Sequence, residues 1–240
     1  MKSAKVNGPI GDLKSFQSCY KNKKINSSTF KESKTYIKSS YYLANINDKP
    51  IKNNIKINKN IIITGPNASG KTTLLKSILL NIIMSQQIGL GCYKRANIHL
   101  YNHFHSYLNI PDTSGRDSLF QAEARRCKDI LQHIEDNIKD RHFCIFDELY
   151  SGTNPNDAVL CAEIYLKGLF QFKCVDFMLT THYIQLCEQL DTYVHNFKMS
   201  VIEKKDKIDY LYKIEKGISY VHGGKQILKD LNYLEYLFQL

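Results

Sequence analysis

The sequence lacks an apolar run of the ~18 residues that a membrane-spanning helix needs. Its longest candidate, residues 78–84, is too short. It also lacks a signal-peptide core behind the N-terminal lysines, because Asn7, Gly8 and Asp12 interrupt that stretch. These absences predict a protein that is neither secreted nor bound in a membrane, and that works in the cytoplasm or the nucleus.

Paired cysteines are missing as well. The seven cysteines lie far apart and form no C-x-x-C motif. They are therefore expected to be reduced thiols in the core of an intracellular protein. His99, His103 and His105 are close in sequence, but no cysteine or carboxylate accompanies them at the spacing of a zinc site. We favour a loop or helix face that carries histidines over a metal site.

Acidic side chains are scarce in the first sixty residues. This stretch has thirteen lysines, no arginine and three acids, so it carries the whole net charge of +10. One interpretation is a basic arm that contacts the phosphates of a polyanion such as DNA. The other is a composition that favours Lys, Asn and Ile throughout. The sequence leaves both open.

Hydrophobic periodicity divides the chain into two parts. The first thirty-five or so residues show no sustained helical or strand period, which predicts poor order. We therefore assign residues 1–40 to a basic N-terminal arm and residues 41–240 to one α/β domain. A domain of this length is large enough to bury a core.

Strand and helix patterns alternate in the second part. Ile55 and Ile57 alternate with polar residues, as in an edge strand, whereas residues 61–63 form an apolar run typical of a strand buried on both faces. Helices are predicted after Lys71, over residues 118–137 and over 158–170, and strands over 143–146 and 175–179. This order predicts a mostly parallel sheet flanked by helices.

Sidedness can be predicted for the helix over residues 118–137. We expect Cys127, Ile130 and Ile134 to face the core, and Glu123 and Arg126 to face the solvent.

A phosphate-binding loop follows the first buried strand. Residues 65–72 fit the pattern G-x-x-x-x-G-K-[ST], with a strand before and a helix after. The predicted phosphate contacts are Gly65, Pro66, Asn67, Ala68, Ser69, Gly70, Lys71 and Thr72. In such a loop backbone amides surround the phosphates, Lys71 reaches the β and γ phosphates of ATP, and the Thr72 hydroxyl binds Mg²⁺.

Polar side chains follow two later strands. Asp147 and Glu148 end an apolar strand, and His182 ends the next one. Carboxyl ends of parallel strands meet at one sheet edge, so all three should lie beside the loop. We expect Asp147 to hold the metal shell, Glu148 to activate the attacking water, and His182 to donate a hydrogen bond to the γ-phosphate or that water.

Taken together, these residues resemble the ATPase domain of the MutS family, a P-loop NTPase of the ABC-ATPase type. The resemblance rests on four stretches. The first is residues 64–73, with Thr-Gly-Pro-Asn at its start and Gly-Lys-Thr-Thr at its end. The second is the Asp147–Glu148 pair followed by Gly152, Thr153 and Asp157. The third is Thr-His-Tyr at residues 181–183, and the fourth is the start of the predicted helix at residues 117–123. The resemblance implies that Thr73, the last residue of the first stretch, also contacts the nucleotide.

The resemblance also implies a composite site. It places Ser118 against the γ-phosphate bound by the opposite subunit, and Ile51 near the adenine. It implies a homodimer, or a heterodimer with another MutS-like protein, that hydrolyses ATP in DNA mismatch repair or recombination. DNA contact would come from the basic arm or from a partner.

Some features depart from the family pattern. Leu119 replaces the signature threonine, and Arg116 and Asp117 change the flanking charge. The sequence corresponds to the family's ATPase part, so a stand-alone ATPase, a fragment and one piece of a split protein are alternatives. A regulatory switch that partners a longer relative is the alternative function.

Overall fold

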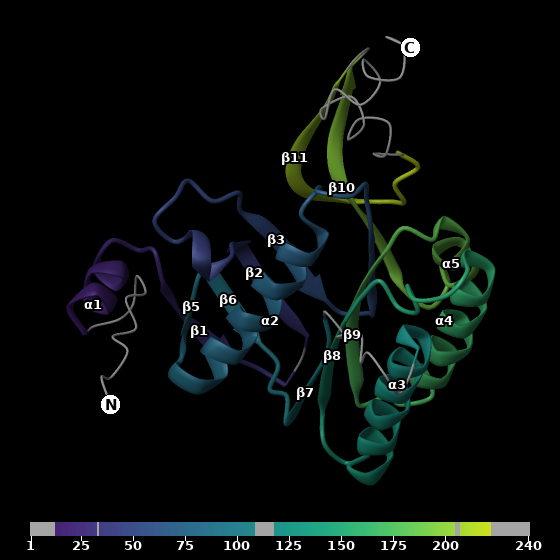
Figure 1. The fold of residues 1–240 in the computed structure, drawn as a ribbon. Helices are drawn as coiled ribbons and strands as arrows, with labels where there is room; N and C mark the ends of the chain where they lie inside the picture. The colour runs from purple at the N-terminus through teal and green to yellow at the C-terminus, as the bar shows by residue number, and fades with distance from the viewer. Residues whose placement is uncertain (1–12, 33, 109–117, 205–206, 222–240) are drawn as a thin grey trace, which may run out of the picture. The chain divides into compact units, whose positions relative to one another are not determined.

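The structure, a computed structural model, describes residues 13–32, 34–108, 118–204 and 207–221 (Figure 1). The chain divides into two compact units. The first comprises residues 1–58 and 76–100, and the second comprises residues 59–75 and 101–240. Among the described residues, no helix combines the length and the apolar character needed to cross a membrane.

The first unit is built on a five-stranded sheet in the order β3-β2-β6-β1-β5. Its strands are β1 (Asn26–Phe30), β2 (Thr35–Ser40), β3 (Asn53–Ile57), β5 (Leu90–Gly91) and β6 (Arg95–Ile98). The helix α1 (Leu13–Lys21) precedes the sheet, and a short 3-10 helix, η1 (Leu43–Asn45), connects β2 to β3.

One face of this sheet is buried and the other is exposed. Ile37, Ile55 and Ile57 are almost completely buried, whereas Lys38 and Lys56 are exposed. The antiparallel strands β2 and β3 show the alternation expected of a sheet with one face toward solvent. β3 lies at the sheet edge, as its sequence predicts.

The structure differs from the expectation of poor order in the first thirty-five residues. Helix α1 and strand β1 lie in this segment, and β2 begins at Thr35. The sequences of β1 and β2 do not show the sustained alternation that would predict a strand. β1 pairs with β5 and β6, and β2 pairs with β3 and β6, so the partners come from residues later in the chain. The division at residue 40 stays a prediction.

The second unit contains a six-stranded sheet in the order β11-β10-β4-β9-β8-β7. All neighbouring pairs are parallel except β10 with β11. The strands are β4 (Ile61–Thr64), β7 (His103–Tyr107), β8 (His142–Asp147), β9 (Val175–Thr181), β10 (His195–Lys204) and β11 (Lys207–Lys216). The predicted mostly parallel sheet is confirmed.

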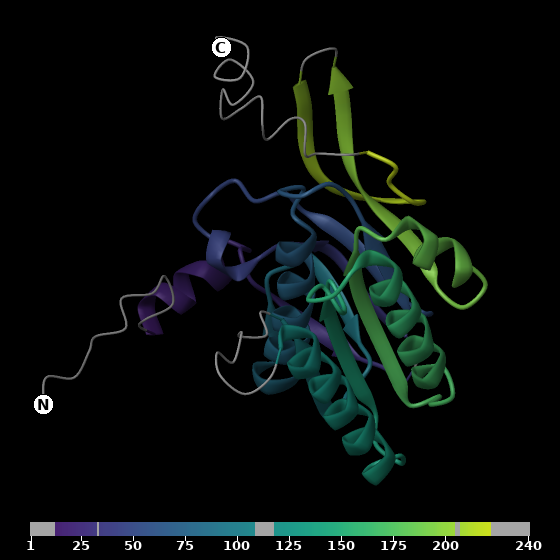
Figure 2. The ribbon, with the colours of Figure 1, turned by 45° about the vertical axis from the view of Figure 1, so that its right-hand side comes forward.

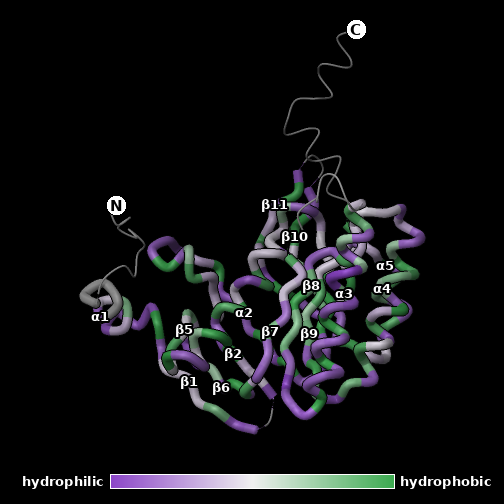
Figure 3. The backbone as a smooth tube through the Cα atoms, turned by 60° about the horizontal axis from the view of Figure 1, so that its bottom comes forward, coloured by the Kyte–Doolittle hydropathy of each residue, from purple (hydrophilic) through white to green (hydrophobic). Residues whose placement is uncertain are grey.

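Helices α3 (Leu119–Asp136), α4 (Pro155–Leu169) and α5 (Ile184–Gln189) pack on one face of this sheet (Figures 1 and 2). Helix α2 (Lys71–Ile88) begins in the second unit and continues into the first. The core between sheet and helices joins Phe146 and Phe177 to Ile130, Ile134 and Leu166. Hydrophobic stretches run along β8 and β9 (Figure 3).

The hairpin of β10 and β11 was not predicted. β10 pairs with β4 only over residues 195–198, and its remainder extends beyond that strand together with β11 (Figure 1). Most of its residues are exposed or only partly buried, so much of the hairpin faces solvent. The apolar residues at every second position over 208–214 are the signal that could have indicated the second strand.

Candidate nucleotide-binding site

The predicted site residues of the second unit converge at one edge of its sheet. β4 ends at Thr64, β8 at Asp147 and β9 at Thr181, and the register pairs Thr64 with Thr181 and Asp147 with Thr180. The phosphate loop, the acidic pair and His182 therefore follow the carboxyl ends of three adjacent parallel strands. This is the edge at which α/β proteins bind ligands.

The loop has a backbone shape that suits glycine at position 70. Gly70 has φ +92°, a conformation that side-chain-bearing residues rarely adopt. A Cβ atom there would also lie 3.1 Å from Cδ1 of Tyr212, on β11. The Tyr212 ring therefore lies against the loop. The sequence reasoning missed this neighbour because it did not predict β11.

The Lys71 side chain lies inside the loop. It is 6% exposed, and its Nζ donates to the backbone oxygen of Gly65 at 2.9 Å and to that of Pro66 at 3.4 Å. The same Nζ is 3.6 Å from Oε1 of Glu148. The structure thus brings a buried ammonium group and the second acid of the predicted pair together.

Asp147 is held from two sides. The Thr72 hydroxyl donates to its Oδ2 at 2.7 Å, and the Thr180 hydroxyl donates to its Oδ1. Hydroxyl and carboxylate oxygens are the ligand types that Mg²⁺ prefers. The described residues contain no group of three or more His, Cys, Asp or Glu side chains arranged to hold a metal. One carboxylate and one hydroxyl fit an ion that takes its other ligands from phosphates and water.

Glu148 lies between two cationic or polar partners. Its Oε1 is 3.7 Å from Nδ1 of His182 as well as near Lys71. The neighbouring imidazole of His182, together with the charge of Lys71, lowers the pKa of this carboxyl, although burial opposes the shift. Glu148 has φ +53° and is one third exposed. It is therefore an ionised, accessible carboxylate on a turn that the surrounding structure must hold.

Glu123 helps to hold the turn that carries Glu148, and its burial contradicts our prediction. We expected its side chain to face solvent, but it is 2% exposed. Oε1 accepts from the amide of Ser151 at 3.1 Å and from its hydroxyl at 2.9 Å, and Oε2 accepts from the amide of Gly152 at 3.1 Å. The prediction that Glu123 faces solvent rested on helical spacing alone. The segment after the acids covers it and supplies the donors.

Gly152 completes this contact. A Cβ atom at Gly152 would lie 2.7 Å from Cγ of Leu119 and 2.9 Å from the backbone nitrogen of Phe120. Only a residue without a side chain lets the backbone approach the first turn of α3 this closely. The segment that follows the acidic pair is therefore fixed to the start of α3.

Ser118 is the N-cap of α3. Its hydroxyl accepts from the amide of Gln121 at 3.3 Å, and the Gln121 side chain accepts from the Ser118 amide at 2.9 Å. The residue is exposed, as a group that faces a partner would be. Its neighbours Arg116 and Asp117 lie outside the described residues. The interaction with a partner's nucleotide stays a prediction.

The two remaining candidates are exposed. Thr73 follows the loop in α2, and Ile51, 45% exposed, precedes β3 in the first unit. Their contacts with nucleotide also stay predictions.

The histidines lie elsewhere. His103 and His105 are on β7 rather than on a loop or helix face. His105 is 3.1 Å from Nδ1 of His142, at the start of β8, and His103 is 3.2 Å from Nε2 of His133, on α3. The register pairs His103 with His142, at the start of both strands, so His103 lies at the amino edge of the sheet. The cluster therefore lies near the amino edge of the sheet, whereas the phosphate loop follows the carboxyl end of β4.

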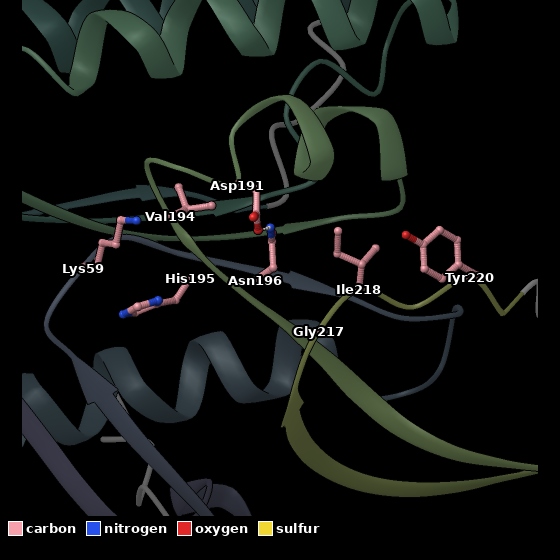
Figure 4. Close-up of a pocket in the computed structure, with 8 residues that line it drawn as sticks. All are labelled: Lys59, Asp191, Val194, His195, Asn196, Gly217, Ile218 and Tyr220. Carbon is pink, nitrogen blue, oxygen red and sulfur yellow. Dashed lines mark hydrogen bonds between the residues drawn. The ribbon is translucent and has the colours of Figure 1, made fainter.

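A pocket of about 430 Å³ also lies at an amino end, that of β10 (Figure 4). Lys59, Asp191, His195 and Asn196 line it together with Tyr220. The Asn196 side chain donates to Asp191 at 2.9 Å, as the figure shows. No residue of the phosphate loop and neither acid contributes to it. We therefore separate this pocket from the nucleotide-binding site.

A phosphate loop, an acidic strand end and a polar third strand end on a mostly parallel sheet define a P-loop ATPase of the ABC type. The model of the family described as MutS domain V matches residues 61–232. The chain belongs to the MutS family and contains its ATPase domain. ATP is accordingly the nucleotide of the site.

Relatives include a DNA mismatch repair protein Msh3 of Dictyostelium discoideum, 31% identical over 71% of this chain and 13% of the relative. A DNA mismatch repair protein MutS of Petrotoga mobilis is 32% identical over 70% of this chain and 21% of the relative. A MutS protein homolog 4 of mouse is 30% identical over 72% and 19%. The matched part is between 13% and 21% of the length of these three relatives.

Proposed function

We propose that this chain is a Mg²⁺-dependent ATPase that works as a dimer in DNA mismatch repair or recombination. The observation that carries the proposal is the convergence of Lys71, Thr72, Asp147 and Glu148 at one sheet edge. The relatives' names support the DNA repair setting. We expect the protein to act inside the cell, in the cytoplasm or nucleus.

The loop binds the phosphates of ATP. The loop leads into the start of α2, where backbone amides and the helix dipole supply positive potential for the phosphates. The Lys71 ammonium group, which lies inside the loop, reaches the β and γ phosphates. The Ser69 hydroxyl is buried and has no hydrogen-bond partner among the described protein groups, which suits a phosphate oxygen. The Tyr212 ring lies beside Gly70 and contacts the nucleotide in this proposal.

Glu148 prepares the attacking water. Its lowered pKa keeps the carboxylate ionised at neutral pH, so it can accept a hydrogen bond from water and orient it toward the γ-phosphate. His182 holds Glu148 from the other side and is 50% exposed, so it can also donate to the phosphate. Thr72 and Asp147 would hold Mg²⁺, which neutralises charge on the phosphates when bound.

The dimer is either a homodimer or a heterodimer with a longer MutS-like protein. The second candidate is a regulatory subunit that partners such a protein and has no DNA recognition of its own. DNA contact would come from the basic N-terminal residues or from the partner.

One experiment tests the central proposal. ATP hydrolysis by the purified chain is measured with and without Mg²⁺, and with duplex, mismatched and branched DNA. Lys71→Ala serves as the inactive control, because it removes the only cation inside the loop. Turnover that needs Mg²⁺ and disappears in Lys71→Ala supports the site. Equal turnover in Lys71→Ala contradicts it.

A further inference from the structure

The exposed face of the first unit's sheet is cationic and regular. Lys38, on β2, lies directly opposite Arg95, on β6, and Lys56, on β3, lies directly opposite Tyr36, on β2. Directly paired residues of a sheet share one face, and residues two apart in a strand do so as well. The three cations therefore lie on the same face of three neighbouring strands, and all three are exposed.

No acidic residue balances these charges within the strands. The described strands β1, β2, β3 and β6 contain no Asp or Glu. Among the described residues, Lys38, Lys56 and Arg95 also form no ion pair with a carboxylate. The charge of this face is thus uncompensated by neighbouring side chains.

The Lys38–Arg95 pair is unfavourable by itself. Like charges directly opposite in a sheet destabilise it, by up to about 1 kcal/mol. Neither residue is required there by packing, since both are exposed. An anion lying across β2 and β6 would convert this repulsion into two attractive contacts.

The chemistry of the face suits a phosphate backbone. Neighbouring strands are about 4.8 Å apart, so the three cations form a flat array rather than a single point. Tyr36 and Asn97 are paired opposite each other on the same face, and Asn97 is paired with Thr29. Hydroxyl and amide side chains with Lys and Arg are the groups that contact phosphate oxygens in DNA complexes.

We propose that this face, which we call the cationic sheet face and define by Lys38, Lys56, Arg95 and Tyr36, binds the phosphate backbone of duplex DNA. The proposal rests on the proposed role in DNA repair and gives it a binding surface in this chain. Of the thirteen lysines in residues 1–60, the proposal assigns DNA contact to Lys38 and Lys56. It adds Arg95, which lies outside that segment.

The test compares two triple variants with the same loss of charge. One is Lys38→Gln with Lys56→Gln and Arg95→Gln. The other replaces exposed lysines of the second unit, Lys128→Gln with Lys139→Gln and Lys173→Gln. Binding of each full chain to a fluorescent DNA duplex is measured at several salt concentrations. ATP hydrolysis and circular dichroism are measured in parallel, because none of the six residues belongs to the nucleotide-binding site.

We expect the sheet-face variant to lose at least tenfold in affinity at low salt, and the control to stay within about twofold of wild type. Three lost phosphate contacts should also reduce the slope of log affinity against log salt by about 2.7. Equal losses in both variants would show a net-charge effect and overturn the proposal. So would wild-type binding by the sheet-face variant, or binding to anionic phosphatidylserine vesicles but not to duplex DNA.

These outcomes are independent of the ATPase assignment. If the sheet-face variant loses DNA binding but hydrolyses ATP at the basal wild-type rate, the surface is confirmed while the site is unaffected. If the wild-type chain hydrolyses ATP but does not bind duplex DNA at low salt, the proposed surface is wrong and the ATPase site is not.

Discussion

Both carboxylate oxygens of Glu123 are used to hold the segment that follows Glu148, and Ser151 alone donates to one of them twice. Glu123 is on α3, the helix that Ser118 begins, so this contact joins the expected partner-facing helix start to the catalytic turn. Glu148 and Tyr150 in that turn both have positive φ, which costs energy unless neighbours fix it. We therefore propose that Glu123 is a positioning residue for Glu148.

We predict that Glu123→Gln slows hydrolysis without weakening ATP binding. The amide nitrogen of Gln cannot accept from the donors that face it, and each unsatisfied buried donor costs about 1–3 kcal/mol. A loss of 1.4 kcal/mol at the transition state is a tenfold loss of rate. Single-turnover hydrolysis should fall about tenfold, while the affinity for a fluorescent ATP analogue stays within about twofold.

The matched control is Glu135→Gln, an exposed residue on the same helix, which should behave as wild type. If the loss of rate in Glu123→Gln merely follows the loss of folded protein by circular dichroism, Glu123 supports the fold alone. Glu123→Asp keeps the charge and should recover part of the rate.

A second prediction concerns Glu148 itself. Glu148→Gln should bind ATP and stall before hydrolysis, because an amide cannot accept a proton from water. Loss of a general base lowers rates by about 10² to 10⁴. Single-turnover rates measured by quench flow check this. A rate equal to wild type would show that another group activates the water.

The main architecture of the second unit could be predicted from its sequence. An apolar run such as residues 61–63 indicates a strand buried on both faces. The glycines and the lysine of residues 65–72 indicate a phosphate-binding loop. The burial of Glu123 could not be predicted, because the donors that satisfy it come from a loop whose path the sequence does not reveal. β1 and β2 were missed for a similar reason, since their stability comes from pairing with β5 and β6.

A third prediction concerns acid stability. Burial lowers the pKa of His105 to about 4, and the charges of His142, His133, His103 and Arg126 add to the shift. In the unfolded chain the pKa is near 6.5. Between these values the unfolded state binds a proton that the folded state does not, so stability is full above about pH 6.5 and decreases as the pH falls toward 4.

Urea unfolding at about pH 7.5 and about pH 5 measures this loss, which linkage limits to about 2 kcal/mol over that pH range. In His105→Gln, which cannot titrate, the pH dependence should be weaker. His195→Gln, outside the cluster, should leave it unchanged. An identical pH dependence in wild type and His105→Gln would contradict the assignment.

A fourth prediction follows from the Lys38–Arg95 pair. Without DNA, Arg95→Gln should stabilise the chain by a few tenths of a kcal/mol, since it removes a directly opposed like charge. Lys56→Gln is the control, because Lys56 lies opposite Tyr36 and not a cation. Thermal unfolding at low and high salt measures both. A destabilised Arg95→Gln at low salt would show that the two cations do not repel.

The last prediction tests the composite site. Ser118 is exposed at the start of α3, and the family resemblance places it against the nucleotide of a partner subunit. ATP bound across an interface favours the assembled state. We therefore expect ATP to promote self-association, most clearly in Glu148→Gln, where hydrolysis cannot reset it. Analytical ultracentrifugation with and without ATP measures this.

Mixing two inactive variants then identifies which chain supplies each group. In a dimer of one Lys71→Ala chain and one Ser118→Ala chain, a composite arrangement joins the intact Lys71 of one subunit to the intact Ser118 of the other. One site per mixed dimer should work, so the mixture should regain activity that neither variant shows alone. If mixed dimers form, as shown by pull-down with two tags, and no activity returns, Ser118 does not act on the partner's nucleotide. A chain that stays monomeric with ATP and hydrolyses it at the full rate would exclude the composite site altogether.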